Sequence, residues 1–502
     1  MKPVADVGLI LEGTYPYVAG GVSSWVHQII RGFPEYRFAV LFIGSSRQDY
    51  AQMRYELPEN VVHLEEHYIH GNTDKPRVRA LDRDADAYRM VARLHEYFRA
   101  PQKHSDAVIG ESLEALSSGG RLTLESFLHS RASWEYTTEQ YRQFSRDPSF
   151  IDYFWTVRTM HRPLWVLARA AESFPPVRMH HVLSTGYAGF LAAVLRRKSG
   201  RPLLLTEHGI YTKERKIDLF HSEWIRDNRD PFARDPVEIG YLRDLWIRFF
   251  ESLGRMCYGA ADDIVSLYQA NRERQIADGA PADRTRTVPN GVDLARLAAL
   301  RATRPEGGPP PVLCLLGRVV PIKDVKTFIR AIHVMAKRMP QIEGWIAGPT
   351  DEDPAYAEEC RLLAESIGVA ERVKFLGFQK IEDVLPKAGL LVLSSISEGL
   401  PLVLLEGFAA GVPAVTTDVG SCRQLVHGLP GEDSAIGAAG RIIGIADPEA
   451  LAAAALELLG HPAAWREAQA AGIARVERYY SQERLFAEYR ALYAKGLAQW
   501  PE

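Results

Sequence analysis

Short apolar runs alternate with helical segments through the second half of the chain. The runs fall at residues 312–316, 344–347, 373–376, 390–393 and 414–416, with helical segments at 325–338 and 356–367 between the first three. Strands that alternate with helices are typical of a doubly wound parallel sheet. Ligands of such sheets bind at the carboxyl ends of the strands, so the residues that follow each run carry most of the functional information.

The first half of the chain shows the same alternation with one interruption. Predicted strands fall at residues 7–11, 38–43, 61–64, 177–183, 202–206, 263–266 and 285–288. Between about residues 71 and 149 the chain is charged, and helical periodicity at 87–98 and 122–127 indicates a helical insertion. The insertion is either a surface elaboration or an element for acceptor binding or partner docking.

The length and one Gly/Pro-rich segment predict two domains. A chain of 502 residues exceeds what one hydrophobic core usually serves. The segment Gly307-Gly308-Pro309-Pro310-Pro311 has the composition of a linker. We therefore expect a first Rossmann-like domain at residues 1–300, a second at 301–475, and a last helix at 476–502 that crosses back to the first. The predicted fold class is α/β, with two doubly wound domains facing across a cleft.

Composition excludes several classes of function. With 60 basic and 63 acidic residues the net charge is -3, which offers no electrostatic footprint for nucleic acid. Four cysteines without Cys-x-x-Cys spacing indicate reduced thiols and a cytoplasmic protein. The chain shows no secretory signal and no apolar run of about 18 residues, so no membrane span is expected. Neither a Gly-x-Gly-x-x-Gly nor a P-loop pattern is present.

The run at residues 390–393 passes directly into a helix through Ser397-Glu398-Gly399-Leu400-Pro401. Pro401 suits the first helical position, and the unpaired amides of a helix start bind anions such as phosphate. Gly399 lets the backbone approach a ligand closely. Carboxylates do not bind phosphate, so Glu398 and Glu406 are expected to hold hydroxyls on either side of it, as a sugar nucleotide requires. The alternative is a surface loop followed by a solvated helical Glu.

Cations and glycines follow two other predicted strands. Arg318 and Lys323 flank a tight turn after residues 312–316, where a guanidinium fork and an ammonium suit a diphosphate leaving group. The alternative is a pair of solvated surface bases. Gly20 and Gly21 precede the first helix and can bring backbone amides against the same phosphates. A flexible turn would explain them equally well.

These motifs together resemble a known family of enzymes. The spacing of Glu398 and Glu406 resembles the Glu-x7-Glu signature of the retaining family-4 glycosyltransferases, and Thr206-Glu207-His208-Gly209 resembles their active-site His motif. The Arg318 and Lys323 turn resembles their Gly-Arg…Lys motif. The long segment at residues 11–27, LEGTYPYVAGGVSSWVH, resembles the glycosyltransferases of Pel exopolysaccharide assembly.

The resemblance implies a GT-B fold, a UDP-sugar donor, retention at the anomeric carbon, and transfer of a hexose or N-acetylhexosamine to a growing polysaccharide. It implies catalytic roles for four residues: His208, Glu398, Arg318 and Lys323. It implies that the donor and its nucleotide contact ten residues: Gly20, Gly21, Arg318, Lys323, Gly348, Phe378, Glu398, Gly399, Leu400 and Glu406. It also implies work with inner-membrane Pel synthase components, through which the protein would associate peripherally with that membrane.

Three further expectations concern individual residues. Phe378 follows the run at 373–376 and frames the nucleotide base in the family, although core packing is an alternative. Ser421 departs from the family, where Gly-Gly is usual. Glu207 should point away from His208, because neighbours on an extended strand face opposite sides.

No metal or other cofactor is expected. Acidic patterns at residues 82–86 and 351–353 could suggest carboxylate ligands, but solvated loops explain them better, and the two cations already supply positive charge for a diphosphate. Two rival classes of function remain open. One is a sugar-nucleotide epimerase or phosphorylase with the same fold, and the other is a non-catalytic nucleotide-binding assembly subunit.

Overall fold

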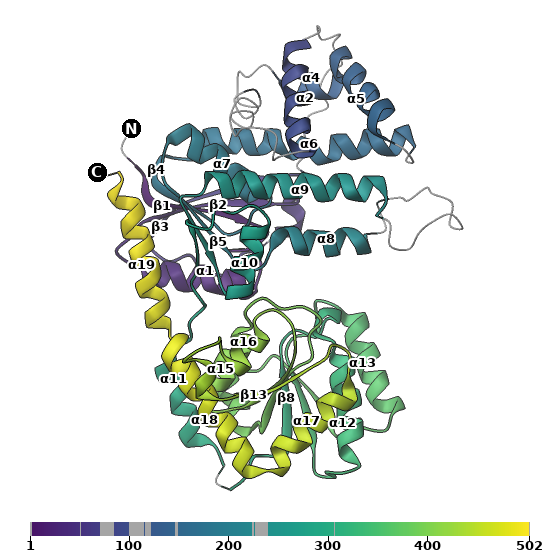
Figure 1. The fold of residues 1–502 in the computed structure, drawn as a ribbon, viewed down its shortest axis with the longest axis vertical. Helices are drawn as coiled ribbons and strands as arrows, with labels where there is room; N and C mark the ends of the chain where they lie inside the picture. The colour runs from purple at the N-terminus through teal and green to yellow at the C-terminus, as the bar shows by residue number, and fades with distance from the viewer. Residues whose placement is uncertain are drawn as a thin grey trace. The chain divides into compact units, whose positions relative to one another are not determined.

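The computed structural model describes residues 3–50, 52–70, 85–99, 115, 122–145, 149–222, 225, 239–305 and 307–500. The chain divides into two compact units, Met1–Thr287 with Tyr489–Glu502, and Val288–Glu488. Each unit is a parallel sheet with helices packed on it (Figure 1), so the predicted α/β class with two Rossmann-like sheets is confirmed.

The first unit is built on a seven-stranded parallel sheet in the order β3-β2-β1-β4-β5-β6-β7. Its inner strands are apolar and buried along almost their whole length, which requires helices on both faces. The strands are β1 (Ala5–Glu12), β2 (Phe38–Gly44), β3 (Val61–Tyr68), β4 (Val177–Val182), β5 (Leu203–Glu207), β6 (Asp263–Ser266) and β7 (Thr285–Thr287). The helices around them are α1 (Gly21–Gly32), α7 (Tyr187–Ser199), α8 (Tyr211–His221), α9 (Tyr241–Ala260) and α10 (Gln269–Ala277).

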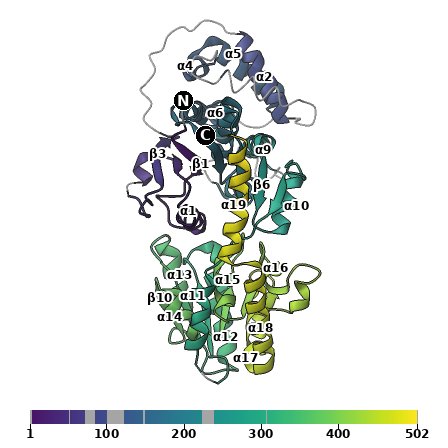
Figure 2. The same cartoon turned by 90° about the vertical axis from the view of Figure 1, so that its left-hand side faces the viewer.

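The segment predicted as an insertion is helical wherever the structure describes it. Its helices are α2 (Ala85–Arg99), α4 (Leu124–His129) and α5 (Arg131–Phe144); α6 (Phe150–Ser173) follows directly after the predicted bounds and is drawn with them in Figure 2. Serine and threonine side chains start three of them, since Thr123, Ser130 and Ser149 each accept a hydrogen bond from the first turn of the helix that follows. The side chains of the acidic pattern at 82–86 lie outside the described residues.

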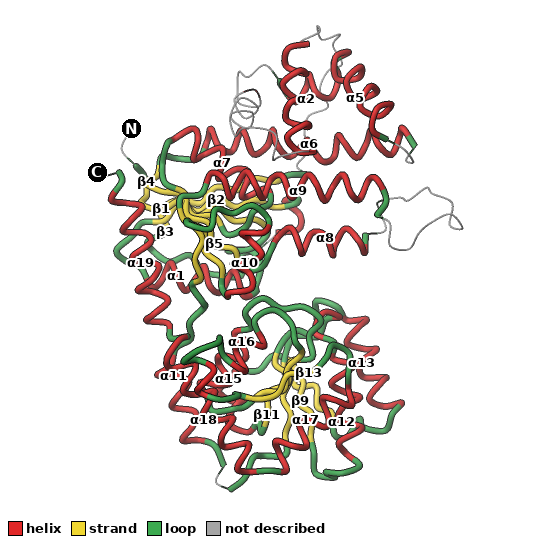
Figure 3. The backbone as a smooth tube through the Cα atoms, in the orientation of Figure 1, coloured by secondary structure: helices red, strands yellow, loops and turns green. Residues whose placement is uncertain are grey.

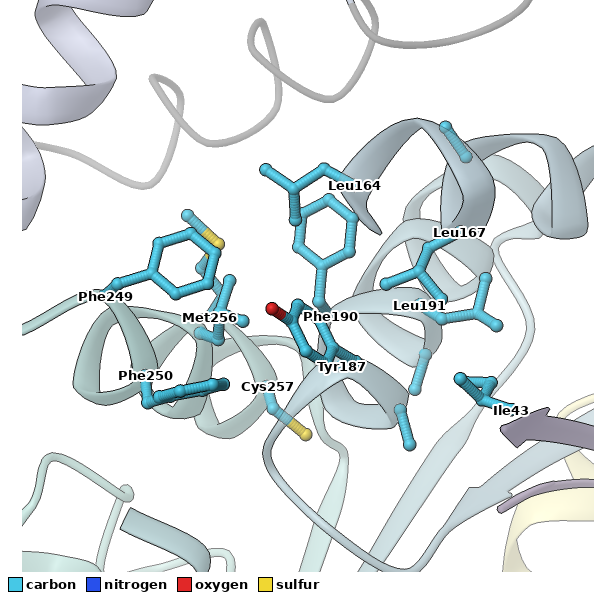
Figure 4. Packing of buried hydrophobic residues seen from close by; sticks show 14 of the residues in the cluster. Ile43, Leu164, Leu167, Tyr187, Phe190, Leu191, Phe249, Phe250, Met256 and Cys257 are labelled. Carbon is cyan, nitrogen blue, oxygen red and sulfur yellow. The ribbon is translucent and has the colours of Figure 1, made fainter. Parts of the chain in front are cut away.

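The core of the first unit joins this helical segment to the sheet. Side chains of α6, α7 and α9 interlock above the strands, as Figure 4 shows for Leu164, Phe190 and Phe249. All three are buried, and α6 and α9 both pack on α7. The helical segment is therefore part of the first hydrophobic core and not a separate one.

The second unit repeats the design with six parallel strands in the order β10-β9-β8-β11-β12-β13. The strands, yellow in Figure 3, are β8 (Val312–Leu316), β9 (Glu343–Ala347), β10 (Val373–Gly377), β11 (Leu390–Leu393), β12 (Ala414–Thr417) and β13 (Gly440–Ile443). The first five match the predicted runs to within a residue or two. The helices are α11 (Leu294–Ala299), α12 (Val325–Ala336), α13 (Pro354–Ser366), α14 (Ile381–Val384), α15 (Leu402–Ala409), α16 (Cys422–His427), α17 (Pro448–Gly460) and α18 (Pro462–Tyr479).

The last helix, α19 (Gln482–Ala498), is shared between the units, because Tyr489 and the residues after it belong to the first. The turn at Asn290 to Asp293 is fixed to the chain before α19. Val292 N donates to Tyr480 O at 2.9 Å, and Gln482 N donates to Val292 O at 3.0 Å. The four cysteines are buried and free. No helix in the described part of the chain is both long and apolar enough to span a bilayer.

In each sheet the order in which successive strands are added reverses once. The chain lays down three strands outward from β1 or β8, then returns to place β4 beside β1 and β11 beside β8. Ligands of open parallel sheets bind beyond the strand ends at such a reversal. The segments that follow β1, β4, β8 and β11 are therefore where a site is expected.

Candidate functional site

Lys323 and Glu398 form an ion pair where β8 and β11 end side by side in the second unit. The Nζ atom of Lys323 lies 2.6 Å from Oε1 of Glu398, and their side chains are only 19% and 13% exposed. The two residues are 75 positions apart in the chain, and the strand reversal brings them together. An ion pair this sheltered is less screened by solvent than one on the surface.

Hydrogen bonds fix the two loops that carry this pair. Ser395 Oγ donates to the same Glu398 oxygen at 2.6 Å, so this carboxylate has two partners. Ser394 Oγ donates to Lys323 O at 2.9 Å, and Ile396 N donates to Ile322 O at 2.8 Å. The lysine and the glutamate are thus held by cross-linked backbone segments.

Arg318 does not join the pair of Lys323 and Glu398; it forms an ion pair with Glu352 instead. Its Nη1 atom lies 2.6 Å from both carboxylate oxygens of Glu352, and the two side chains are 47% and 50% exposed. Exposed pairs of this kind contribute about 0–1 kcal/mol, so an anionic ligand could displace Glu352 at little cost. Asp353 caps α13 by accepting from Tyr356 N at 3.0 Å. Glu352 and Asp353 therefore have structural partners.

Gly348 permits close approach between the loops that follow β8 and β9. A Cβ atom at this position would lie 1.9 Å from Gly317 O, which no side chain can tolerate. Gly317 N donates to Ala347 O and Val319 N donates to Pro349 O, each at 3.0 Å. Gly348 thus shapes the Arg318 loop through the backbone.

The segment from Glu398 to Leu400 rests on the loop that follows β12. Gly420 has a φ of 55°, and a Cβ atom there would lie 2.3 Å from Glu398 O. Ser421, which departs from the Gly-Gly of the family, donates its backbone N–H to Gly399 O at 2.9 Å. The amide of Ser421 supports the glycine loop, and its buried Oγ has no partner among the described residues.

The helix after this segment starts one residue later than predicted. It is α15, and it begins at Leu402, so Pro401 precedes the helix with a φ of -72° and a ψ of 109°. An extended ψ at this position is typical of a capping residue, which explains the difference. The side chain of Leu400 is buried, so only its backbone can serve a ligand.

Glu406, one turn inside α15, is a carboxyl group with a perturbed pKa. Burial is the main reason that the pKa of Glu406 is raised to about 7; the charge of Arg296 opposes this shift, and that of Glu382 adds to it. Arg296 itself donates to Glu382. Near neutral pH Glu406 can therefore either accept a hydrogen bond as a carboxylate or donate one as an acid.

Phe378 lies directly after β10 with 79% of its surface exposed. The alternative interpretation of this residue as core packing is wrong. Gly377 before it has a φ of 64°, a backbone conformation that favours glycine and turns the chain outward. The exposed ring is available for stacking on a flat ligand.

In the first unit, Gly20 and Gly21 stand at the start of α1. The helix begins at Gly21, and no side-chain cap satisfies its first turn. A Cβ atom at either position would meet nothing within 4 Å. The helix start is therefore open on the side of both glycines, as an anion site requires.

His208 follows β5 and is neutral at physiological pH. Burial lowers the pKa of its imidazole to about 4. Its Nε2 atom has no hydrogen-bond partner in the described part of the chain. A buried, unpaired ring nitrogen after a strand end is unusual unless a ligand completes it.

Glu207 points away from His208, as predicted from strand geometry. Its carboxylate accepts hydrogen bonds from four groups, each within 3.1 Å: Thr185 Oγ1, Tyr211 N, Tyr258 Oη and Gln275 Nε2. Burial raises its pKa. Glu207 is fully occupied inside the core and is no candidate for a general base.

Three further polar groups of the first unit were not predicted. Thr14 Oγ1, Trp25 Nε1 and Ser184 Oγ are buried and lack a partner among the described residues. Thr14 follows β1, Ser184 follows β4, and these strands neighbour each other in the sheet. The signal that could have found Ser184 is its place directly after a strand. No group of three or more metal-binding side chains occurs within the described residues.

Two family models match the chain. Residues 5–283 match the model of a domain of unknown function (DUF3492), and residues 310–461 match the model of glycosyl transferases group 1. The first match alone spans more than half of the 502 residues. The boundary between the two matches falls near the division between the two units.

Curated relatives match over part of their length. D-inositol 3-phosphate glycosyltransferase of Salinispora tropica is 29% identical over 347 residues, which are 66% of this chain and 66% of that protein. The protein of the same name from Streptomyces griseus is 30% identical over 270 residues, 50% of this chain and 54% of its own length. The chain thus spans between about half and two thirds of these relatives.

Solved structures share the fold along almost the whole chain. Anabaena Alr3699/HepE in complex with UDP has a TM-score of 0.58 at 14% identity and covers 98% of this chain and 100% of its own. Sucrose-phosphate synthase from Thermosynechococcus elongatus has a TM-score of 0.58 at 17% identity, with the same coverage. The chain therefore belongs to the DUF3492 family; its residues 310–461 match the glycosyl transferases group 1 model, and its fold is the GT-B fold of the solved structures.

Proposed function

We propose that the chain is a retaining glycosyltransferase that moves a hexose or N-acetylhexosamine from a UDP-sugar to a growing exopolysaccharide. The observation that carries this proposal is the ion pair of Lys323 and Glu398 at the joined ends of β8 and β11. A lysine fixed at a strand end provides a point charge for a diphosphate, and the carboxylate beside it accepts hydrogen bonds from sugar hydroxyls.

The uridine diphosphate part of the donor has its own supporting residues. The exposed ring of Phe378 suits a flat base, and the half-buried carboxyl of Glu406 suits the ribose hydroxyls. Arg318 forms an exposed ion pair with Glu352, and breaking this pair to bind the phosphates would cost little free energy. Structures of the similar HepE contain UDP and UDP-glucose, which favours uridine in this proposal.

Catalysis in this proposal depends on stabilising the leaving group. The bond between the anomeric carbon and the phosphate oxygen breaks through an oxocarbenium-like state, and UDP departs with the electron pair. Lys323, Arg318 and the backbone amides at Gly399 and Leu400 stabilise the developing charge. The acceptor oxygen attacks the same face and gives its proton to the departing phosphate. Loss of one such contact typically costs about 10²–10³ in rate.

His208 contributes a neutral imidazole in this proposal. Its low pKa keeps the ring uncharged at physiological pH, so Nε2 can form a hydrogen bond with a hydroxyl of the donor hexose. Gly20 and Gly21 add amides at an open helix start.

The acceptor and the cellular context rest on the likeness of residues 11–27 to PelF, the glycosyltransferase of Pel exopolysaccharide assembly. The proposal accordingly includes a Pel-like polysaccharide acceptor, a cytoplasmic location and docking on inner-membrane Pel synthase components. It requires no metal, because Lys323 and Arg318 supply the positive charge for UDP.

Product analysis with a panel of UDP-sugars, with and without oligosaccharide acceptor, tests the proposed function. We expect UDP release that depends on the acceptor, persists in a chelator, and gives a product with the anomeric configuration of the donor by NMR. An epimerised UDP-sugar, or a sugar 1-phosphate formed with inorganic phosphate, would point to the rival enzymes. UDP binding without turnover would point to an assembly subunit.

Lys323→Met should weaken UDP binding at least about tenfold, since a hydrogen bond to a charged group contributes about 1.5–3 kcal/mol. Isothermal titration calorimetry with UDP measures the change. Lys326→Met is the matched control, because Lys326 forms a similar 2.6 Å pair with Glu359 away from the strand ends. Undiminished UDP affinity in the Lys323 variant would contradict the proposed phosphate site.

The affinity for UDP-glucose should rise severalfold from pH 6 to pH 8. With a pKa of about 7, Glu406 goes from about one tenth to about nine tenths ionised over this range. The carboxylate accepts hydroxyl hydrogen bonds more strongly than the acid does. Glu406→Gln should remove this dependence. A pH profile with the same slope in the variant would exclude Glu406 as its source.

Glu398→Gln should lower the transfer rate by about 10²–10³ while UDP affinity changes by only a few fold. Its side chain is expected to contact the donor hexose, which UDP lacks. Steady-state kinetics and calorimetry on the same preparation separate the two effects. Glu359→Gln, which alters only the surface pair with Lys326, controls for the loss of a negative charge. Unchanged turnover would remove Glu398 from the mechanism.

A further inference from the structure

The imidazole of His208 is not held by any hydrogen bond to the described residues. Its Nε2 atom is buried without a partner, and the contact that the structure does show is with the indole of Trp25. The last side-chain torsion of a histidine is broad and roughly twofold. The orientation of the His208 ring must therefore be set by the side chains that pack against it.

Trp25 meets His208 in an edge-to-face arrangement. The ring centroids are 4.8 Å apart and the planes are inclined by 77°. Such T-shaped contacts are a preferred geometry of aromatic pairs, because the positive edge of one ring meets the negative face of the other. Trp25 is only 1% exposed and lies on α1, four residues after Gly21.

Trp25 in turn is supported by the last helix. The ring of Tyr489 lies 5.1 Å from that of Trp25 at 70°. Tyr489 Oη is 2.9 Å from Thr206 Oγ1, which is 2.9 Å from His181 Nε2. Thr206 lies on β5, two residues before His208, so these contacts link Trp25 to the strand that the histidine follows.

We propose that Trp25, held by Tyr489, is a positioning residue that sets the ring orientation of His208 and keeps water away from it. This inference rests on the proposed function of His208 for its effect on catalysis. The geometric part stands independently, because the ring contact and the unpaired nitrogen do not depend on the reaction.

The proposal has a consequence for the protonation of His208. Burial is the cause of its lowered pKa of about 4. The titratable neighbour is His181, whose pKa burial lowers to about 3, so it carries no charge near neutral pH. Glu207 faces the other side of β5. Removing the indole should admit water and raise the pKa of His208 toward its ordinary value of about 6.5.

The test compares Trp25→Ala and Trp25→Phe in the full chain. NMR of histidine labelled at the ring carbon follows titration from pH 8 to pH 5, with His208→Gln identifying the signal. We expect His208 to stay unprotonated in the wild type and in Trp25→Phe, which retains an aromatic ring. In Trp25→Ala it should titrate within this range. Phe328→Leu is the control, because it changes an equally buried aromatic residue in the second unit, and it should leave the His208 signal unaltered.

Kinetics provide the second readout. Trp25→Ala should lower kcat at least about tenfold with the donor KM within about twofold, and Trp25→Phe should restore most of the rate. If Trp25→Ala does not fold, Tyr489→Leu should shift the His208 titration in the same direction. An unchanged titration in Trp25→Ala and Tyr489→Leu would overturn the proposal. A shifted titration with no transferase activity even in the wild type would instead contradict the proposed function alone.

Discussion

The single reversal of strand order in each parallel sheet determines where chemistry can take place. Because every strand in a sheet runs the same way, all carboxyl ends share one edge, and the reversal places the first and fourth strands side by side. Lys323 and Glu398 meet for this reason alone. In the first unit the same rule brings the segments after β1, β4 and β5 to one edge, which carries Thr14, Ser184 and His208.

The two ion pairs at the edge of the second sheet differ in kind. The pair of Lys323 and Glu398 is sheltered, and Ser395 hydrogen-bonds to its carboxylate, so separating the partners costs more than separating surface charges. The pair of Arg318 and Glu352 is half exposed and easily exchanged. A diphosphate bound at this edge would therefore replace Glu352 as the partner of Arg318 at little cost, whereas Lys323 is already held in position. Preorganised charge of this kind is the main source of electrostatic catalysis.

The pattern of apolar runs and strand ends in the sequence was enough to predict the fold and some residues of the candidate site. Five strands of the second sheet matched their apolar runs, whereas β13 went unpredicted because Arg441 interrupts a run of only four residues. Strand-end position marked Lys323 and Glu398 as separate site candidates, but it did not predict their ion pair. The partner of Arg318 could not be predicted, since the loop at 351–353 has no periodicity. Trp25 lies on the buried face of α1 with other apolar residues, and only its three-dimensional contact with His208 distinguishes it.

The division of α19 between the two units affects how this protein can be cut into fragments. A chain cut after Thr287 would contain every strand of the first sheet yet lack Tyr489 and Tyr493, two fully buried aromatic rings. Their loss would strip the hydroxyl partners from Thr206 and His181 and expose one face of Trp25. An isolated amino-terminal fragment would thus lack the packing around Trp25 and His208. Ligand binding or activity measured on such a fragment would be weaker than the contribution of the same residues in the intact protein.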